Sequence, residues 1–450
     1  MSSLSLRICV VGAGAAGLCA ARRAVEQLPG AEVSILEQSD QLGGTWVYTE
    51  QQQGAQPTHS SMYAELRTNI PKEIMNFCDF PIESVDFSDH QNSDDSFPRH
   101  EVILSYLKRF AEPIKHLIKF NLRVLSIVPF GEDKISHLKM PCQANDNFGT
   151  KWRIVSEETT SKKRTFVEYF DVVFVCSGHY WCPRIPTFAN KLKIRWAHSH
   201  SYRRAEQFAG MHVAVVGANL SGVEIALQLA EHAEKVYLIN SSENAALGGG
   251  NSAPNSNVLI ELNGSRVTDA VDASLVLADG RVVGQLHFVL FCTGYLFSFP
   301  FFDQQMNSGV VRCDGNFVSP LIGHVVHPNF LNSLFFIGFN LLVVPFPCFD
   351  IQVNINKKRF TMEMAKHWED KRIQRLEAEQ MPQKYFHRLG PDQWKYFEWL
   401  NSLSGFKPFP EVFENIYKFN LEQKRKNPRT YRNIRYQIVD QQTFTTKLLK

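Results

Sequence analysis

Glycines at strand-to-helix turns are the first residues in this chain that could do chemistry. Residues 12–17 read GAGAAG; they follow the apolar stretch RICVV, a predicted strand, and precede an Ala-rich predicted helix. Glycine permits the tight turn, lets the backbone approach a pyrophosphate, and lets the helix pack close to the strand. The free N–H groups of the helix N-terminus favour phosphate. The predicted phosphate-binding residues are Gly12, Ala13, Gly14, Ala15, Ala16 and Gly17.

A carboxylate follows this turn at a spacing that suits a ribose. The next predicted strand, EVSIL, leads into Glu37, twenty residues after Gly17. An acid in that place accepts hydrogen bonds from a ribose diol. The complete strand–turn–helix–strand unit with its terminal acid predicts a site for the ADP moiety of a dinucleotide. The alternative is a glycine-rich turn that binds nothing.

A second copy of this unit occupies residues 212–240. HVAVV and KVYLI are its predicted strands, but Asn219 replaces the middle glycine of the turn. Asn tolerates unusual backbone angles, yet its side chain takes space that a pyrophosphate would use. We therefore expect looser or shifted nucleotide binding, and the alternative is a degenerate turn without a ligand. The predicted contacts are Gly217, Asn219, Ser221, Gly222, Val223 and Glu224.

The strand end of the second copy also differs from the first. Asn240 stands where the first copy has Glu37. A carboxylate there would repel a 2′-phosphate, so its absence favours NADP over NAD. No Arg follows to bind that phosphate, and the nearest basic pair is Arg203-Arg204. The residues alone thus favour NADPH over NADH without excluding NADH.

The elements that carry these residues repeat one design. Each copy closes with a buried strand and a glycine turn, VVFVCSGHY in the first and FVLFCTGY in the second. Two dinucleotide sites in one chain indicate a flavin that receives electrons from a nicotinamide. We predict an α/β fold with two Rossmann-like domains, the NADPH domain inserted into the FAD domain, and a helical C-terminal region. The predicted parts are residues 1–185 and 299–450 for the FAD domain, which include that C-terminal region, and 186–298 for the NADPH domain.

Composition and cysteine usage exclude several other classes. The net charge of +3 gives no reason to expect a nucleic-acid partner. The nine cysteines form no CxxC pair, so we expect neither a zinc site nor a thioredoxin-like dithiol. Disulfide reductases need a cysteine pair soon after the first glycine turn, whereas Cys176 and Cys182 lie far along the chain. Free cysteines in predicted strands indicate a reducing compartment.

Two segments raise the question of a membrane. Residues 329–349 carry no charge and could span a bilayer, but Asn332, Asn340, Pro345 and Pro347 favour a buried strand, SLFFIGF, followed by an apolar loop. The basic run of residues 423–436 could touch a membrane surface, and a solvated, ion-paired face is the preferred interpretation. Since a strand begins almost at once, no signal peptide is expected. We predict a cytoplasmic enzyme without a transmembrane anchor, with peripheral contact at the endoplasmic reticulum as the alternative.

The chain resembles the flavin-containing monooxygenases, and insect members most closely. The resemblance covers nearly its whole length and rests on GAGAAG with Glu37, LGGTW (42–46), LRTNIPKEIMNFCDFP (66–81), HSHSYR (198–203), FCTGY (291–295) and HRLGPDQWKYFEWL (387–400). It implies FAD, NADPH and O2, with a flavin hydroperoxide giving one oxygen atom to an amine nitrogen or sulfide sulfur. Xenobiotics or dietary toxins are the implied substrates, in an N,N-dimethylaniline-type reaction.

The resemblance also assigns residues near the flavin. From the residues alone, Asn69 would be a turn or cap residue. The family match makes it the catalytic candidate, because an Asn there lies beside flavin and nicotinamide and can donate from its amide. Retained NADP+ shields the reactive oxygen in this family. The further cofactor contacts that the resemblance implies are Gly44, Thr45, Trp46, Thr68, Asn69 and Ile70.

Three departures from the family all fall on the NADPH side. In the family signature before the second unit, His198 and Tyr202 match, but Leu192 and Ile194 replace Phe and Gly. The second departure is Asn219, and the third is the missing Arg, with 241–243 reading SSE. We therefore expect a firm FAD site and weaker NADPH affinity, or a relaxed preference between NADPH and NADH.

Other functions stay open at this stage. One is an uncoupled NADPH oxidase, or a flavoprotein with weakened oxygenase activity, because the second turn is altered. Another is a Baeyer–Villiger type ketone oxygenase, which normally carries an Arg beside the nicotinamide and a differently spaced signature. The partners expected are a small amine or sulfide and O2, and the sequence leaves both a monomer and a homodimer open.

Overall fold

Five parallel strands form the central sheet of the first unit. The computed structural model describes residues 5–50, 60–82, 95–130, 151–160, 163–244, 247, 258–302, 310–354 and 362–449. Helix α1 (Ala15–Gln27) connects two neighbouring strands, as a parallel pair requires. In spatial order the strands are β20 (Leu334–Phe336), β7 (Val172–Val175), β1 (Arg7–Val11), β2 (Glu32–Leu36) and β3 (Ile118–Lys119).

The second unit repeats this arrangement. Its helix α3 (Leu220–Leu229) connects β10 (His212–Val216) to β11 (Lys235–Ile239), as α1 connects β1 to β2. The pairing of His212 with Lys235 matches that of Arg7 with Glu32, so both glycine turns leave their sheets at equivalent points. Strands β1, β2, β10 and β11 have the bounds predicted from the sequence. In spatial order the sheet holds β12 (Leu259–Leu262), β11 (Lys235–Ile239), β10 (His212–Val216), β16 (Phe288–Phe291) and β9 (Arg195–His198).

A small antiparallel sheet accompanies each parallel sheet. In the first unit this sheet consists of β4 (Leu122–Phe130), β5 (Lys151–Glu158) and β6 (Thr165–Phe170). The second unit has a shorter counterpart in β13 (Val267–Val271), β14 (Ser274–Leu277) and β15 (Val282–Val283). The two units therefore share a design down to their accessory strands.

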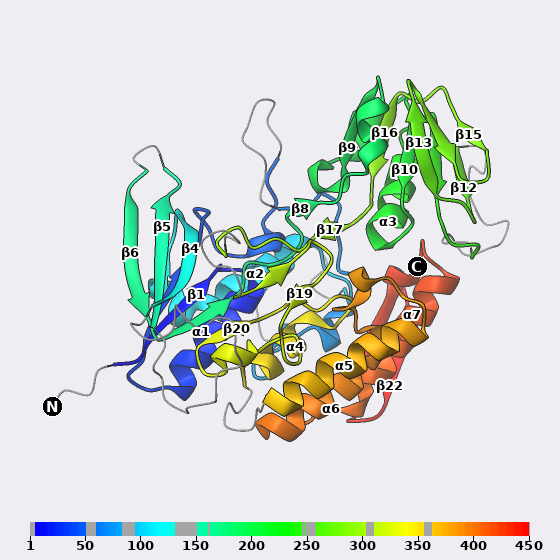
Figure 1. Ribbon diagram of the computed structural model, residues 1–450. Coiled ribbons are helices and arrows are strands. Elements are labelled where there is room, and N and C mark those ends of the chain that lie inside the picture. Colours follow the sequence, from blue (N-terminus) through cyan, green and yellow to red (C-terminus); the bar gives the residue numbers. More distant parts are fainter. Residues whose placement is uncertain are drawn as a thin grey trace.

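The second unit is inserted into the first, as predicted. Its sheet uses only strands between residues 195 and 291, whereas the first sheet takes β20 from beyond the insertion. The two chain crossings pair as a short antiparallel ribbon of β8 (Cys182–Pro183) and β17 (Tyr295–Leu296), visible between the units in Figure 1. The boundaries at 185 and 298 themselves stay predictions.

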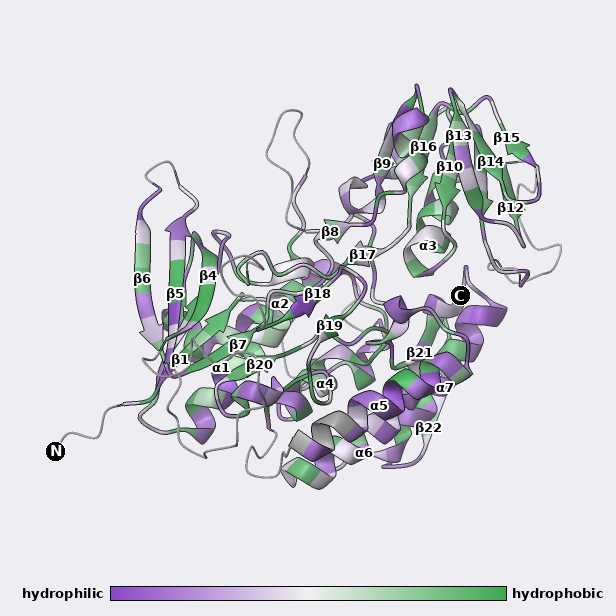
Figure 2. Ribbon diagram, in the orientation of Figure 1, coloured by the Kyte–Doolittle hydropathy of each residue, from purple (hydrophilic) through white to green (hydrophobic). Residues whose placement is uncertain are grey.

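Helices dominate the C-terminal region, which packs under the first unit (Figure 1). Trp394, Leu400 and Ile416 enter the same hydrophobic core as α1 and the first sheet. In Figure 2 the strands of the sheets are largely hydrophobic, while much of the outer surface of the C-terminal helices is hydrophilic. The helices are α4 (Pro345–Val353), α5 (Met362–Ala378), α6 (Gln393–Ser404) and α7 (Glu411–Lys426), before the hairpin β21 (Ile434–Ile438) and β22 (Phe444–Leu448). The remaining elements are α2 (His100–Ala111), β18 (Arg312–Cys313) and β19 (Val318–Ser319).

The uncharged segment 329–349 contributes many side chains to the hydrophobic core of the first unit. β20 is buried in the first sheet, which confirms the predicted strand. The apolar loop expected after it is wrong in part, because helix α4 begins at Pro345, and proline is favoured in the first turn of a helix. Within the described residues, no helix has both the length and the apolar character needed to cross a membrane.

Candidate functional site

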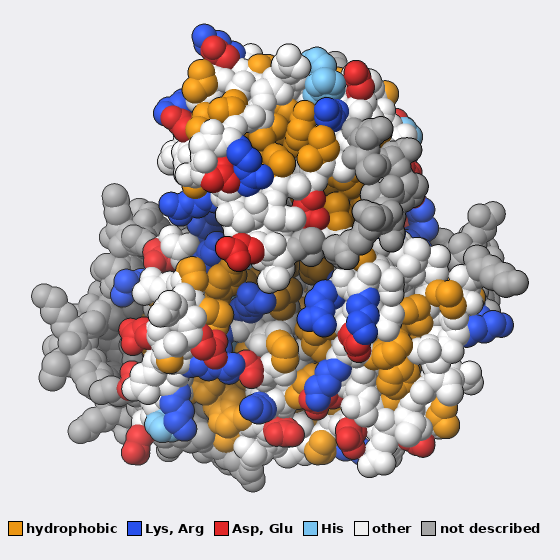
Figure 3. All heavy atoms as spheres, turned by 90° about the vertical axis from the view of Figure 1, so that its right-hand side faces the viewer, with side chains coloured by type: hydrophobic (Ala, Val, Ile, Leu, Met, Phe, Trp, Pro, Cys, Tyr) orange, Lys and Arg blue, Asp and Glu red, His pale blue; other side chains and the backbone are white. Residues whose placement is uncertain are grey.

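Both glycine turns open onto one cavity between the two units. Its volume is about 1730 Å³, and its walls come from both Rossmann-like units, the loop of residues 61–70 and the C-terminal region. Figure 3 shows the second unit above the first, with basic side chains along the facing edge of the lower part. The cavity brings together most of the residues predicted from the sequence: Gly12, Gly14, Ala15, Ala16, Glu37, Gly44, Thr45, Trp46, Asn69, Ile70, Asn219, Ser221, Val223 and Glu224.

The other predicted site residues do not line the cavity but belong to the segments that form its wall. Ala13, Gly17, Gly217 and Gly222 belong to the two turns, and Thr68 precedes Asn69. A Cβ on Gly17 would lie 1.9 Å from the carbonyl oxygen of Gly12, and one on Gly222 would lie 1.7 Å from that of Gly217. Only glycine lets each helix pack this close to its strand, as the sequence predicted.

The middle glycine of the first turn, Gly14, matters for its missing side chain and not for its backbone angles. Gly12 has a φ of +101°, so this position does need glycine. Gly14 is extended (φ −75°, ψ −179°), and its Cβ would meet Gly44 at an ordinary 3.5 Å. The protein itself would therefore tolerate a side chain there. Its absence keeps the N-terminus of α1 open to the cavity, which fits a pyrophosphate.

Glu37 ties the end of β2 to this turn. Its Oε2 accepts the backbone N–H of Ala13 at 2.7 Å, and its Oε1 accepts the N–H and the hydroxyl of Ser39 at 2.9 and 2.8 Å. The carboxylate is buried at the cavity wall. It is thus held in one orientation beside the place where a ribose would lie.

The LGGTW segment closes the first site from the other side. Gly43 donates its N–H to the carbonyl of Ala13 at 3.0 Å. A Cβ on Gly44 would lie 2.9 Å from the Cα of Gly14. Two backbone segments of the protein therefore lie in close contact here, and Thr45 and Trp46 line the cavity.

The second turn has the same shape with its middle position filled. Gly217 has a φ of +107°, and its Cβ would lie 2.6 Å from the carbonyl oxygen of Cys292. Asn219 caps α3 with φ −79° and ψ −173°, nearly the angles of Gly14. The expectation that Asn serves here for its tolerance of unusual angles is wrong, because this extended backbone suits any residue. What distinguishes Asn219 is the side chain that it adds at the helix N-terminus.

The side chain of Asn240 is used within its own turn. Asn240 donates to the carbonyl of Asn244 at 2.9 Å and accepts the N–H of Ser242 at 3.0 Å, so it stabilises a turn. The buried Arg203 donates to four backbone carbonyls, and Arg204 pairs with Glu50 at 2.9 Å. The basic pair nearest in sequence therefore has structural partners, and neither of its residues lines the cavity.

The residues of the family signature, between 192 and 202, stabilise the second unit. The hydroxyl of Tyr202 donates to Oε1 of Gln228 on α3 at 2.9 Å. Burial lowers the pKa of His198 to about 4, so its ring is neutral near pH 7. Leu192 and Ile194, which replace Phe and Gly, pack in the core beside the second sheet. These two departures are thus absorbed by core packing rather than placed in the cavity.

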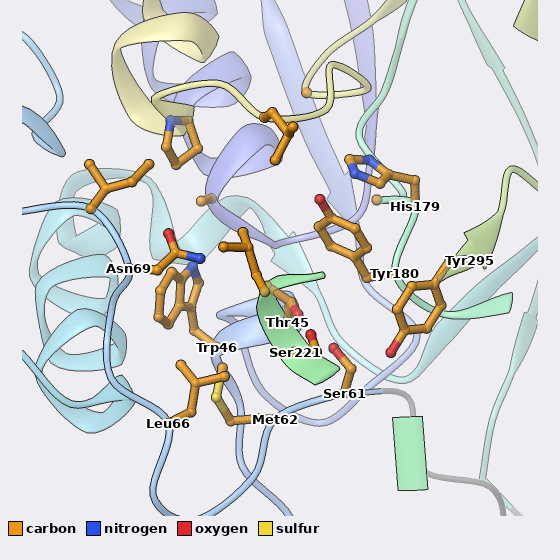
Figure 4. A pocket seen from close by; sticks show the side chains of 18 of the residues that line it. Thr45, Trp46, Ser61, Met62, Leu66, Asn69, His179, Tyr180, Ser221 and Tyr295 are labelled. Atoms are coloured by element: carbon orange, nitrogen blue, oxygen red, sulfur yellow. The ribbon is translucent and has the colours of Figure 1, made fainter. Parts of the chain in front are cut away.

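Asn69 lies on the cavity wall beside the indole of Trp46, and Tyr180, Tyr295 and His179 lie across the same space (Figure 4). Its loop is fixed through the backbone. The carbonyl of Asn69 accepts from Lys424 Nζ at 2.8 Å and from Asn420 Nδ2 at 3.1 Å. The main chain is therefore held from behind while the amide faces the cavity.

The basic run 423–436 is not simply a solvated face, and this expectation needs correction. Lys424 and Arg432 line the cavity. Burial lowers the pKa of Lys424 to about 7; Arg432 contributes to the lowering and Glu224 opposes it. Sequence reasoning missed both residues, because their partners lie 355 and 208 positions away. Only the outward part of the run is solvated, as in the exposed pair of Lys426 with Glu422.

Comparisons with known proteins identify the family. The family model described as "Flavin-binding monooxygenase-like" matches residues 5–248, more than half of the chain. Flavin-containing monooxygenase FMO GS-OX-like 4 of Arabidopsis thaliana is 33% identical over 95% of this chain and 94% of its own length. The chain belongs to the flavin-binding monooxygenase-like family.

Solved structures agree with this assignment. S-allyl-L-cysteine S-oxygenase from Allium sativum superimposes with a TM-score of 0.79 and 28% identity, covering 96% of each chain. Tmm from Pelagibacter sp. strain HTCC7211 has a TM-score of 0.75 and 25% identity, covering 98% of this chain and 96% of its own. The fold of two Rossmann-like units is thus that of solved relatives.

The cofactors of the monooxygenase are FAD and NADPH, and its two turns fit them. The first turn combines an open helix N-terminus with the fixed carboxylate of Glu37. The second keeps the same strand–turn–helix geometry, with Asn219 in the place of a glycine. The two turns face one cavity from the two units, and Asn69 lines the same cavity.

Proposed function

We propose that this monooxygenase transfers one oxygen atom from O2 to the nucleophilic sulfur or nitrogen of small molecules. The second oxygen atom leaves as water, and NADPH supplies the two electrons. The observation that carries the proposal is the single cavity onto which both dinucleotide turns and Asn69 open. The bound flavin would supply the activation of O2, so the chain needs no metal or nucleophilic side chain for that step.

The residues of the chain have defined tasks in this proposal. The N-termini of α1 and α3 bind the pyrophosphates, and Glu37 binds the ribose of FAD. The amide of Asn69 donates a hydrogen bond to the reacting edge of the flavin or to its oxygen. The walls around Trp46, Tyr180 and Tyr295 exclude water from that place.

Sulfur is the acceptor to test first. The garlic relative is an S-allyl-L-cysteine S-oxygenase, and the Arabidopsis relatives are FMO GS-OX proteins. We infer that thioethers are accepted and that tertiary amines of the N,N-dimethylaniline type are a second class, with xenobiotics or dietary toxins as natural substrates. The test is NADPH oxidation with and without a thioether, with the sulfoxide quantified. NADPH loss without sulfoxide or N-oxide would support an oxidase instead.

Three further predictions accompany this function. We propose a cytoplasmic location, a peripheral contact with the endoplasmic reticulum being the alternative, and subcellular fractionation distinguishes them. A homodimer is one option for the assembly, and light scattering measures it. The special resemblance to insect members stays a prediction, since the relatives described above are plant and bacterial.

A further inference from the structure

Arg432 lies where three distant segments of the chain meet. Its Nη2 lies 2.7 Å from Oε2 of Glu224, in the first turns of α3. Its Nε donates to the carbonyl of Thr68 at 2.9 Å, and its Nη2 also approaches that of Arg67 at 3.4 Å. The Arg432 and Glu224 side chains are only 15% and 17% exposed. One guanidinium thus bridges the second unit to the loop that carries Asn69.

The neighbouring carbonyl in this loop is held from the same side. Lys424 and the buried Asn420, both on α7, donate to the carbonyl of Asn69. Two successive carbonyls, those of Thr68 and Asn69, are therefore fixed by the C-terminal region. Because the carbonyls of Thr68 and Asn69 point toward these donors, the donors also set the direction of the Asn69 side chain.

The position of the Glu224–Arg432 ion pair suits it to couple the second unit to the loop that carries Asn69. Glu224 sits at the N-terminal end of α3, the part of the second unit that would receive the NADPH phosphates. The buried Tyr63, in the loop that carries Asn69, also hydrogen-bonds Glu224, so this carboxylate contacts that loop and the C-terminal region together. The planar fork of Arg can bind a carboxylate and a carbonyl at once, whereas a Lys ammonium is a single point charge.

We propose that Arg432 is a positioning residue that couples the placement of the NADPH-binding unit to the orientation of Asn69. The contact runs from α3 through Glu224 and Arg432 to the carbonyl of Thr68. This inference rests on the proposed function for the role of Asn69, whereas the coupling between α3 and the loop stands on the contacts alone. Nucleotide bound at α3 then holds Glu224, and through it the Asn69 loop, in the productive arrangement.

The test uses the FAD-loaded enzyme and four variants: Glu224→Gln, Arg432→Met, Arg432→Lys and the double variant Glu224→Gln/Arg432→Met. Glu422→Gln is the matched control, since it removes the same kind of carboxylate from an exposed pair on α7 with Lys426 at 2.5 Å. Hydrogen exchange of residues 63–70 reports the loop without any need for turnover. FAD content and the sulfoxide formed per NADPH oxidised report the site.

The proposal predicts about tenfold faster exchange of the loop in Glu224→Gln and Arg432→Met, with FAD content unchanged. Product per NADPH falls at least about twofold, the double variant is no worse than either single variant, and Arg432→Lys recovers only part of the coupling. Exchange and coupling equal to those of Glu422→Gln would overturn it, as would additive effects in the double variant. If the wild type forms no oxygenated product, the proposed function fails while the exchange result still decides the coupling.

Discussion

The Oε2 of Glu37 lies 2.7 Å from the backbone nitrogen of Ala13, in the middle of the glycine-rich turn. One carboxylate therefore fixes the end of β2 to the turn, and in the proposed binding mode it would accept hydrogen bonds from the FAD ribose. Replacing Glu37 by Gln removes the charge from this contact and should weaken FAD binding about ten- to a hundredfold. FAD retention after dialysis measures it. The exposed Glu32→Gln, on the same strand, should behave as wild type, and equal retention in both variants would contradict the assignment.

Gly222→Ala should damage the second unit selectively. The added Cβ would lie 1.7 Å from the carbonyl oxygen of Gly217, so α3 must move away from β10. Such overpacking costs about 1–3 kcal/mol or more, and it disturbs the phosphate-binding turn. We expect NADPH binding to be lost while FAD is retained. Gly284→Ala is the control, because its Cβ meets only the Oγ of Ser274 at 3.2 Å.

Asn219→Gly should tighten NADPH binding. The backbone at Asn219 matches that of Gly14, so glycine fits there without rearrangement. The variant restores the open space at the helix N-terminus, and we expect KM for NADPH to fall several-fold with kcat nearly unchanged. Steady-state kinetics with NADPH and NADH measure both the affinity and the preference. An unchanged KM would mean that the Asn side chain does not obstruct the nucleotide, and a micromolar KM with strong NADPH preference in the wild type would contradict a weakened site.

His327 makes stability depend on pH in the acid range. Its Nδ1 accepts the N–H of Asn329 at 3.2 Å, and its Nε2 bonds the carbonyl of Val310, so the neutral ring is fixed in one tautomer. Burial lowers its pKa to about 4, although the Val310 bond opposes this. The folded pKa lies below the unfolded value of about 6.5, so stability is full above pH 6.5 and falls as the pH drops toward 4.

The non-titrating His327→Gln isolates this contribution. The difference in unfolding free energy between wild type and variant should shrink by up to about 3 kcal/mol between pH 7 and pH 4. Denaturant unfolding at several pH values measures it. A difference that stays constant with pH would mean that the pKa of His327 is the same in the folded and the unfolded protein.

Local patterns predicted the nucleotide-binding frame well. The strands at 7–11, 32–36, 212–216 and 235–239 follow from short apolar runs, and the glycine turns from spacing, because these contacts are made within about thirty residues. The contacts that the C-terminal region makes with the site could not be predicted in this way. Arg432 and Lys424 meet Glu224 and Asn69 only through the tertiary fold, so their basic run looked like solvated surface.

The most direct test of the central claim is a reaction of the FAD-loaded enzyme with NADPH, a thioether and ¹⁸O2. We predict a sulfoxide that carries one ¹⁸O atom, formed in nearly equal amount to the NADPH oxidised, with little H2O2. NADPH oxidation matched by H2O2, with no labelled sulfoxide or N-oxide from a tertiary amine, would contradict the account.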